Sequence, residues 1–131
     1  MGPAKMMPRI VVADDERDIL ELLRFVLEFN GFDVVTANNG EEAIREVLAE
    51  KPDLVLLDVR MPRMNGYEAC QTLKANPKTR GIPIVFLSAR GQEADVKHGL
   101  SLGAVDYILK PFSPEDLPGR LRAALASAKG A

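Results

Sequence analysis

The chain has 131 residues, 47% hydrophobic and 27% charged, which is typical of one folded domain and excludes a largely disordered protein. Its net charge of −2 gives no basic surface of the kind that dominates nucleic-acid affinity, so direct nucleic-acid binding is disfavoured. The single cysteine excludes an internal disulfide or thiolate zinc cluster, and no long apolar run is present, so we expect a cytoplasmic protein without a membrane segment.

Short apolar runs alternate with longer segments of helical periodicity along the whole chain, a pattern typical of a parallel α/β sheet. The predicted strands are residues 9–13, 32–36, 53–57, 82–87 and 105–109. The predicted helices end near Asn30-Gly31, stop before Pro52, and then span residues 67–75, 93–102 and 113–126. Because every strand is nearly continuously apolar, we expect helices on both faces, which is a doubly wound α/β fold.

The last two predicted helices carry residues that disfavour a helix. Gly99 lies inside the fourth helix, which we expect to be the loosest, since an interior glycine costs about 0.5–1 kcal/mol relative to alanine. Ser113 and Asp116 resemble a capping box for the fifth helix. Pro118 can neither donate a hydrogen bond to the carbonyl of Pro114 nor avoid clashing with it, so this helix should be distorted or start late.

The domain boundaries follow from the first and last periodic segments. The folded domain is expected over residues 8–126, with flexible tails at residues 1–7 and 127–131. No internal repeat, low-complexity tract or linker divides it.

Polar side chains stand where four of the predicted strands end. Asp14 and Asp15 follow the first strand, Asp58 the third, Ser88 the fourth and Lys110 the fifth. In an open α/β sheet, ligands bind beyond the carboxyl ends of the strands, so we expect these side chains to meet. Crowded carboxylates raise one another's pKa unless a cation neutralises them. The set therefore predicts a hard cation, Mg²⁺, and chemistry on an anionic group.

These motifs together resemble the receiver domain of two-component response regulators over about residues 8–126. The resemblance is carried by Asp14-Asp15, the run from Asp58 to Gly66, Leu87-Ser88-Ala89, and the segment from Gly103 to Phe112. It implies a CheY-like, flavodoxin-like fold: a five-stranded parallel sheet in the order 2-1-3-4-5, flanked by five helices.

The resemblance also implies roles for the acidic residues. Asp58 would be the phosphoacceptor, which attacks the phosphohistidine of a sensor histidine kinase or a histidine phosphotransfer protein. Asp15, Asp58 and the backbone carbonyl of Arg60 would bind Mg²⁺ directly, with Mn²⁺ as an alternative, and Asp14 would act mainly through water. Such a domain is no enzyme in the ordinary sense, since it catalyses only its own phosphorylation and slow dephosphorylation.

A conformational switch is the second implication of the resemblance. Ser88 would hydrogen-bond the phosphoryl group and Lys110 would pair with it, while Tyr107 would turn inward as Ser88 moves. The change would alter the surface of the last two helices and the strand between them, and the bond between Lys110 and Pro111 would be cis. That surface would control a downstream protein or a missing output domain, since few residues follow the fifth helix, and it could form a phosphorylation-dependent homodimer.

Arg60 and Arg90 lie two residues beyond Asp58 and Ser88. In the family these positions border the path of the attacking water, so we hypothesise that both arginines change the lifetime of the aspartyl phosphate. The alternative is two solvated loop cations.

Other functions are left open or disfavoured by the sequence. A phosphorylation-independent interaction module would use the same fold. A phosphatase with an aspartate nucleophile resembles a pattern with a second acid where this chain has Arg60, and it would need a cap domain for its substrate. A nucleotide-binding site is disfavoured because residues 14–17, Asp-Asp-Glu-Arg, replace the glycine-rich loop.

Overall fold

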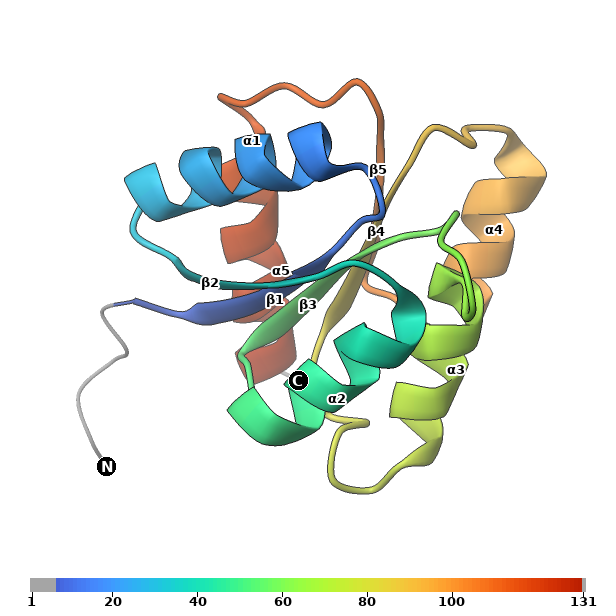
Figure 1. Ribbon diagram of the computed structural model, residues 1–131. Helices are drawn as coiled ribbons and strands as arrows, with labels where there is room; N and C mark the ends of the chain where they lie inside the picture. Colours follow the sequence, from blue (N-terminus) through green and yellow to red (C-terminus); the bar gives the residue numbers. More distant parts are fainter. Residues whose placement is uncertain (1–6, 131) are drawn as a thin grey trace.

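The computed structural model describes residues 7–130 as five parallel strands flanked by five helices (Figure 1). The sheet has the order β2-β1-β3-β4-β5, which confirms the predicted topology. The strands are β1 (Arg9–Ala13), β2 (Asp33–Ala37), β3 (Leu54–Asp58), β4 (Ile84–Ser88) and β5 (Asp106–Leu109). The helices are α1 (Arg17–Phe29), α2 (Gly40–Glu50), α3 (Gly66–Ala75), α4 (Glu93–Ser101) and α5 (Leu117–Gly130).

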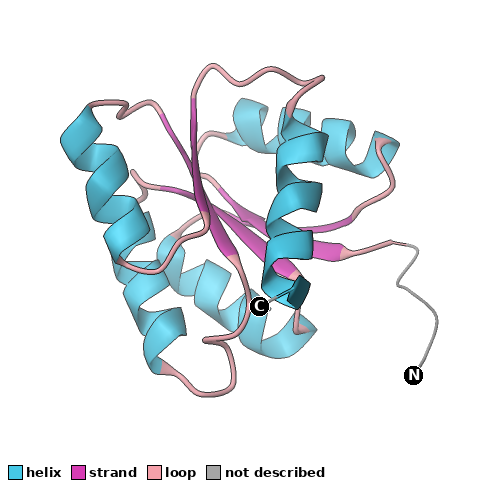
Figure 2. Cartoon of the chain, turned by 180° about the vertical axis from the view of Figure 1, so that it is seen from behind, coloured by secondary structure: helices cyan, strands magenta, loops and turns pink. Residues whose placement is uncertain are grey.

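Helices cover both faces of the sheet, which explains why the strands are apolar on both sides. Helices α1 and α5 lie on one face, and α2, α3 and α4 lie on the other (Figures 1 and 2). Each face has its own buried core, and successive strand residues contribute to opposite cores. Ile10 and Val12 of β1 pack toward α1 and α5, whereas Val11 and Ala13 pack toward α2 and α3.

Several strands are displaced by one or two residues from their predicted positions. The strand predicted at residues 82–87 begins at Ile84, because Pro83 has no amide hydrogen for the ladder. At the other end, pairing continues one residue further than predicted, with Asp58 opposite Leu87 and Ser88 opposite Leu109. Asp58 and Ser88 are therefore the last residues of their strands, so the sheet itself fixes the backbone of both residues.

Helix α5 starts late, as Pro118 led us to expect. It begins at Leu117, which places Pro118 in the first turn, where no amide hydrogen is needed. Before it, the hydroxyl of Ser113 accepts a hydrogen bond from the amide of Asp116 at 3.3 Å. The helix continues through Gly130, so residues 127–130 of the expected tail are helical. Residues 1–6 and 131 of the expected tails lie outside the described residues.

The connection from β3 to α3 is packed tightly against the backbone of Asp58. Asn65 and Glu68 form a capping box, with hydrogen bonds of 2.9 Å and 3.0 Å between each side chain and the other residue's amide. A Cβ atom on Gly66 would lie 2.2 Å from the Asp58 carbonyl oxygen, so only glycine allows this approach. The start of α3 therefore holds the end of β3 in place.

Within residues 7–130, no helix combines the length and hydrophobicity needed to span a membrane.

Candidate functional site

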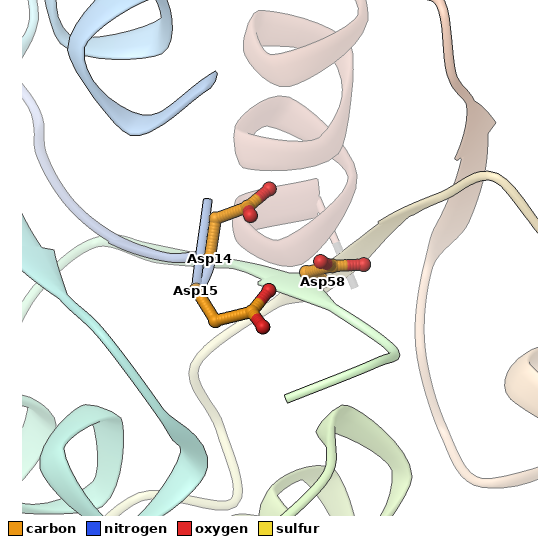
Figure 3. A group of neighbouring side chains, drawn as sticks. All are labelled: Asp14, Asp15 and Asp58. Atoms are coloured by element: carbon orange, nitrogen blue, oxygen red, sulfur yellow. The ribbon is translucent and has the colours of Figure 1, made fainter. Parts of the chain in front are cut away.

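Three carboxylates converge at the carboxyl edge of the sheet (Figure 3). Asp14 and Asp15 follow β1, Asp58 ends β3, and one oxygen from each lies within 4.8 Å of the others. Asp14 and Asp58 are buried, at 1% and 5% exposure, whereas Asp15 is open to solvent. The structure thus brings together the acidic residues that the sequence predicts would meet. Two of these charges lie in the protein interior.

Lys110 supplies a positive charge between the buried carboxylates. Its ammonium nitrogen lies 2.8 Å from an Asp14 oxygen and 3.3 Å from an Asp58 oxygen. Glu16 lies 3.7 Å from the same nitrogen, a contact that we did not anticipate although Glu16 directly follows the aspartate pair. The peptide bond between Lys110 and Pro111 is cis, as the resemblance implied. One lysine cannot neutralise three carboxylates, so the cluster keeps a negative charge.

Burial sets the protonation of Asp58. Desolvation, followed by the charge of Asp14, raises the pKa of Asp58 to about 6, although Lys110 opposes the shift. Burial also disfavours the charged form of Lys110, but the hydrogen bond to Asp14 and the charges of both carboxylates outweigh this and raise the pKa of Lys110. Lys110 therefore stays charged near neutral pH.

The remaining predicted site residues line a pocket beside the carboxylates. The Ser88 hydroxyl is buried and accepts a hydrogen bond from the amide of Arg90 at 3.0 Å. The amide of Arg60 points toward Asp58, at 3.4 Å from a carboxylate oxygen. The pocket has a volume of about 260 Å³ and is lined by Asp15, Glu16, Asp58, Arg60, Ser88, Ala89 and Lys110.

Tyr107 lies outside this pocket. It belongs to β5, and its buried side chain packs against α4. Its side chain is 6% exposed, and its hydroxyl donates a hydrogen bond of 2.7 Å to the carbonyl oxygen of Arg90. Arg90 is also the residue whose amide bonds to Ser88. The loop after β4 therefore links Tyr107 to the pocket through a single residue.

The donor set of the pocket fits a hard divalent cation. Mg²⁺ prefers carboxylate, carbonyl and water oxygens, and typically uses one or two carboxylates while keeping several waters. Asp15 and Asp58 provide such carboxylates at the wall of an open pocket, and the uncompensated negative charge favours a cation there.

The pKa of Asp58 predicts how stability depends on pH and Mg²⁺. Because the folded-state pKa is about 6 and the ordinary value is 3.8, the folded state binds this proton more tightly. The resulting stabilisation is complete below pH 3.8 and is lost as pH rises through about 6. Without metal, the free energy of unfolding should therefore fall across this interval, and Mg²⁺ should stabilise the protein more at about pH 7.5 than at about pH 5.

Thermal unfolding at both pH values, with and without Mg²⁺, measures this effect. The same scans on Asp58→Asn isolate the contribution of Asp58 from those of the other acidic residues. An equal Mg²⁺ effect at the two pH values would contradict the prediction.

Fold and pocket together define a doubly wound α/β domain whose carboxyl edge carries an acidic pocket that can bind a metal ion. The family model of the response regulator receiver domain matches residues 10–122, and the chain belongs to this family. It is a receiver domain of the two-component response regulators, a class of signalling proteins.

Individual relatives agree with this assignment. The alkaline phosphatase synthesis transcriptional regulatory protein PhoP of Bacillus subtilis is 45% identical over 120 residues, which cover 92% of this chain and 49% of that protein. A putative response regulator from Chloroflexus aurantiacus is 34% identical, with a TM-score of 0.87 over 92% of this chain and 98% of that chain. The BeF3-activated N-terminal receiver domain of Klebsiella pneumoniae RstA is 35% identical. The TM-score is 0.82, over 89% of this chain and 97% of that chain.

The chain spans about half the length of the curated relatives it matches.

Proposed function

We propose that the domain accepts a phosphoryl group on Asp58 in a Mg²⁺-dependent reaction with a sensor histidine kinase or a histidine phosphotransfer protein. The observation that carries this proposal is the setting of Asp58. Its carboxylate ends a central strand at the wall of an acidic pocket, 3.3 Å from the ammonium of Lys110. Such a carboxylate can act as a nucleophile toward an anionic donor only where positive charge neutralises both partners.

The residues of the chain align and neutralise the reacting groups. A carboxylate oxygen of Asp58 attacks the phosphorus atom, a new P–O bond forms, and the P–N bond to the donor histidine breaks. Lys110 stabilises the negative charge on the transferring oxygens, and Ser88 can donate a hydrogen bond to one of them. Asp15, Asp58 and the backbone carbonyl of Arg60 would hold Mg²⁺, which would supply further positive charge beside the transferring group.

The phosphoryl group would then shift a conformational equilibrium. A new dianion at Asp58 attracts Ser88 and Lys110, and this difference in contact energy between two states drives the change. Because Arg90 contacts both Ser88 and Tyr107, a movement of Ser88 can pass to the surface formed by α4, β5 and α5. This surface would control a downstream protein or an output domain, or form a homodimer.

Intact mass after incubation with a small phosphodonor and Mg²⁺ tests the proposal. A gain of one phosphoryl group that requires the metal would support it. No gain by a folded protein would favour a phosphorylation-independent interaction module. Continued turnover of a phosphate ester without accumulation would instead indicate an aspartate-nucleophile phosphatase.

Arg60 and Arg90 should set the lifetime of the aspartyl phosphate. Both side chains are exposed, and they line a second pocket of about 390 Å³. This pocket shares Asp15 and Arg60 with the acidic pocket that contains Asp58. A water molecule attacking the phosphoryl group from this side would pass between two cations. We expect Arg60→Ala and Arg90→Ala to change the decay rate by about tenfold, which corresponds to about 1.4 kcal/mol in the barrier.

The decay of the phosphorylated protein, followed by mass after removal of the donor, measures this rate. Arg45→Ala, an arginine on α2 away from both pockets, is the control and should decay like the unchanged protein. Decay at the unchanged rate in both pocket variants would show that the two arginines are only solvated loop residues.

A further inference from the structure

The hydroxyl groups of the two tyrosines of this chain meet between α3, α4 and β5. Tyr67 lies in the first turn of α3, Tyr107 lies on β5, and their oxygens are 3.4 Å apart. No local pattern in the amino-acid sequence indicates this contact, because the two residues are 40 positions apart. Neither the resemblance nor the mechanism above assigns a role to Tyr67.

The donors and acceptors around the two hydroxyls explain how they can bond to each other. Tyr107 donates its hydrogen to the carbonyl of Arg90 at 2.7 Å, so its oxygen is left as an acceptor. Tyr67 can donate to that oxygen, or to the carbonyl of Asp95 in the first turn of α4 at 3.3 Å. Burial, followed by the contact with Tyr107, raises the pKa of Tyr67, so its hydroxyl remains a donor at any physiological pH.

Ring packing holds the Tyr67 hydroxyl at this point. The Tyr67 ring packs edge to face against Phe86 of β4 and His98 of α4, with centroids 5.2 Å and 4.7 Å away. Tyr107 in turn fills the space left by the missing side chain of Gly99, where a Cβ atom would lie 2.8 Å from its ring. The glycine that is expected to weaken α4 thus makes room for Tyr107, and Tyr67 meets the hydroxyl end of that ring.

We propose that Tyr67 is a positioning residue of the switch, which holds Tyr107 in its inward position. Through the carbonyl of Asp95, Tyr67 also connects this position of Tyr107 to the first turn of α4. This inference rests on the proposed function, in which phosphorylation favours the inward position of Tyr107. It adds that the unphosphorylated chain already populates this position through the hydroxyl of Tyr67. Phosphorylation would then increase a population of inward Tyr107 that the contact between the tyrosines already favours.

Fluorine NMR of protein labelled with 3-fluorotyrosine tests the proposal without any phosphodonor. The chain has only two tyrosines, so Tyr67→Phe leaves Tyr107 as the single signal. We expect its exposure to solvent, measured by the shift between H₂O and D₂O, to increase. Loss of one hydrogen bond corresponds to about a threefold to tenfold fall in the ratio of inward to outward Tyr107. Thr72→Val removes an exposed hydroxyl of α3 that donates to the carbonyl of Glu68, and should leave the signal unchanged.

The reciprocal variant keeps the test decisive if Tyr67→Phe folds poorly. In Tyr107→Phe the signal of Tyr67 should also move, because the contact is mutual. A Tyr107 signal that stays buried in Tyr67→Phe, or a Tyr67 signal unchanged in Tyr107→Phe, would overturn the proposal.

A second measurement separates this proposal from the proposed function. Beryllofluoride with Mg²⁺, the kind of activation described for the RstA receiver, mimics a phosphoryl group on Asp58. We expect it to return Tyr107 to the inward position in Tyr67→Phe. Binding of beryllofluoride without this return would overturn the link between Tyr67 and the switch. If neither beryllofluoride nor a phosphodonor modifies Asp58, the proposed function fails, and with it the regulatory role of Tyr67.

Discussion

Asp58→Asn should abolish phosphoryl incorporation and, at neutral pH without metal, should raise the stability of the domain. An amide lacks the negative charge and nucleophilicity of a carboxylate, so no aspartyl phosphate can form at this position. The same change removes one buried charge from a cluster in which a single lysine faces three acids. Because burial and Asp14 raise the pKa of Asp58 to about 6, its charged form is held at a cost in free energy above that pH.

Two measurements on one protein sample check both parts of this prediction. Intact mass after treatment with phosphodonor and Mg²⁺ should show no added phosphoryl group, and thermal unfolding at about pH 7.5 without metal should show a higher melting temperature. Asp116→Asn makes the same chemical change at an exposed carboxylate outside the acidic pocket, and should alter neither result. Phosphorylation of the Asp58→Asn protein would show that another residue is the phosphoacceptor.

The amino-acid sequence predicts the carboxyl-edge site well because periodicity and topology determine it. Continuous apolar runs mark the buried strands, and a parallel sheet brings the residues at the strand ends to one edge. Asp14, Asp15, Asp58, Ser88 and Lys110 could therefore be expected to meet, and the structure places all of them at this edge. Pro118 likewise determines the start of α5 through its missing amide hydrogen.

Contacts between side chains of different helices and strands cannot be predicted in this way. Tyr67 of α3 meets Tyr107 of β5 because its ring packs against Phe86 of β4 and His98 of α4, and this packing depends on side-chain volumes that no local pattern encodes. Gly99 shows the same limit. The sequence indicates a weak helix, but only the packed structure shows that the ring of Tyr107 occupies the missing volume. The exact ends of the strands also depend on their neighbours, since pairing with β4 extends β3 through Asp58.

Lys110→Met should destabilise the metal-free domain and slow phosphorylation strongly. The Lys110 side chain is 12% exposed and lies within 3.3 Å of both Asp14 and Asp58, so methionine preserves much of its volume while removing the positive charge that pairs with both. Breaking a buried ion pair from one side costs about 3–5 kcal/mol, because the remaining charges are left without compensation. The loss should be smaller at about pH 5, where protonation of Asp58 relieves the repulsion.

In Lys110→Met, Mg²⁺ should affect the stability of the domain and the rate of phosphorylation differently, and this difference identifies the role of the lysine. A cation in the pocket can offset the unpaired carboxylates and restore much of the lost stability. It cannot replace a charge aimed at the transferring oxygens, so phosphorylation should stay about 10²–10³-fold slower at saturating Mg²⁺. Lys97→Met, at an exposed lysine paired with Glu93, should change neither quantity appreciably. A Lys110→Met protein that regains both stability and rate with Mg²⁺ would show that the lysine serves only to neutralise the buried carboxylates.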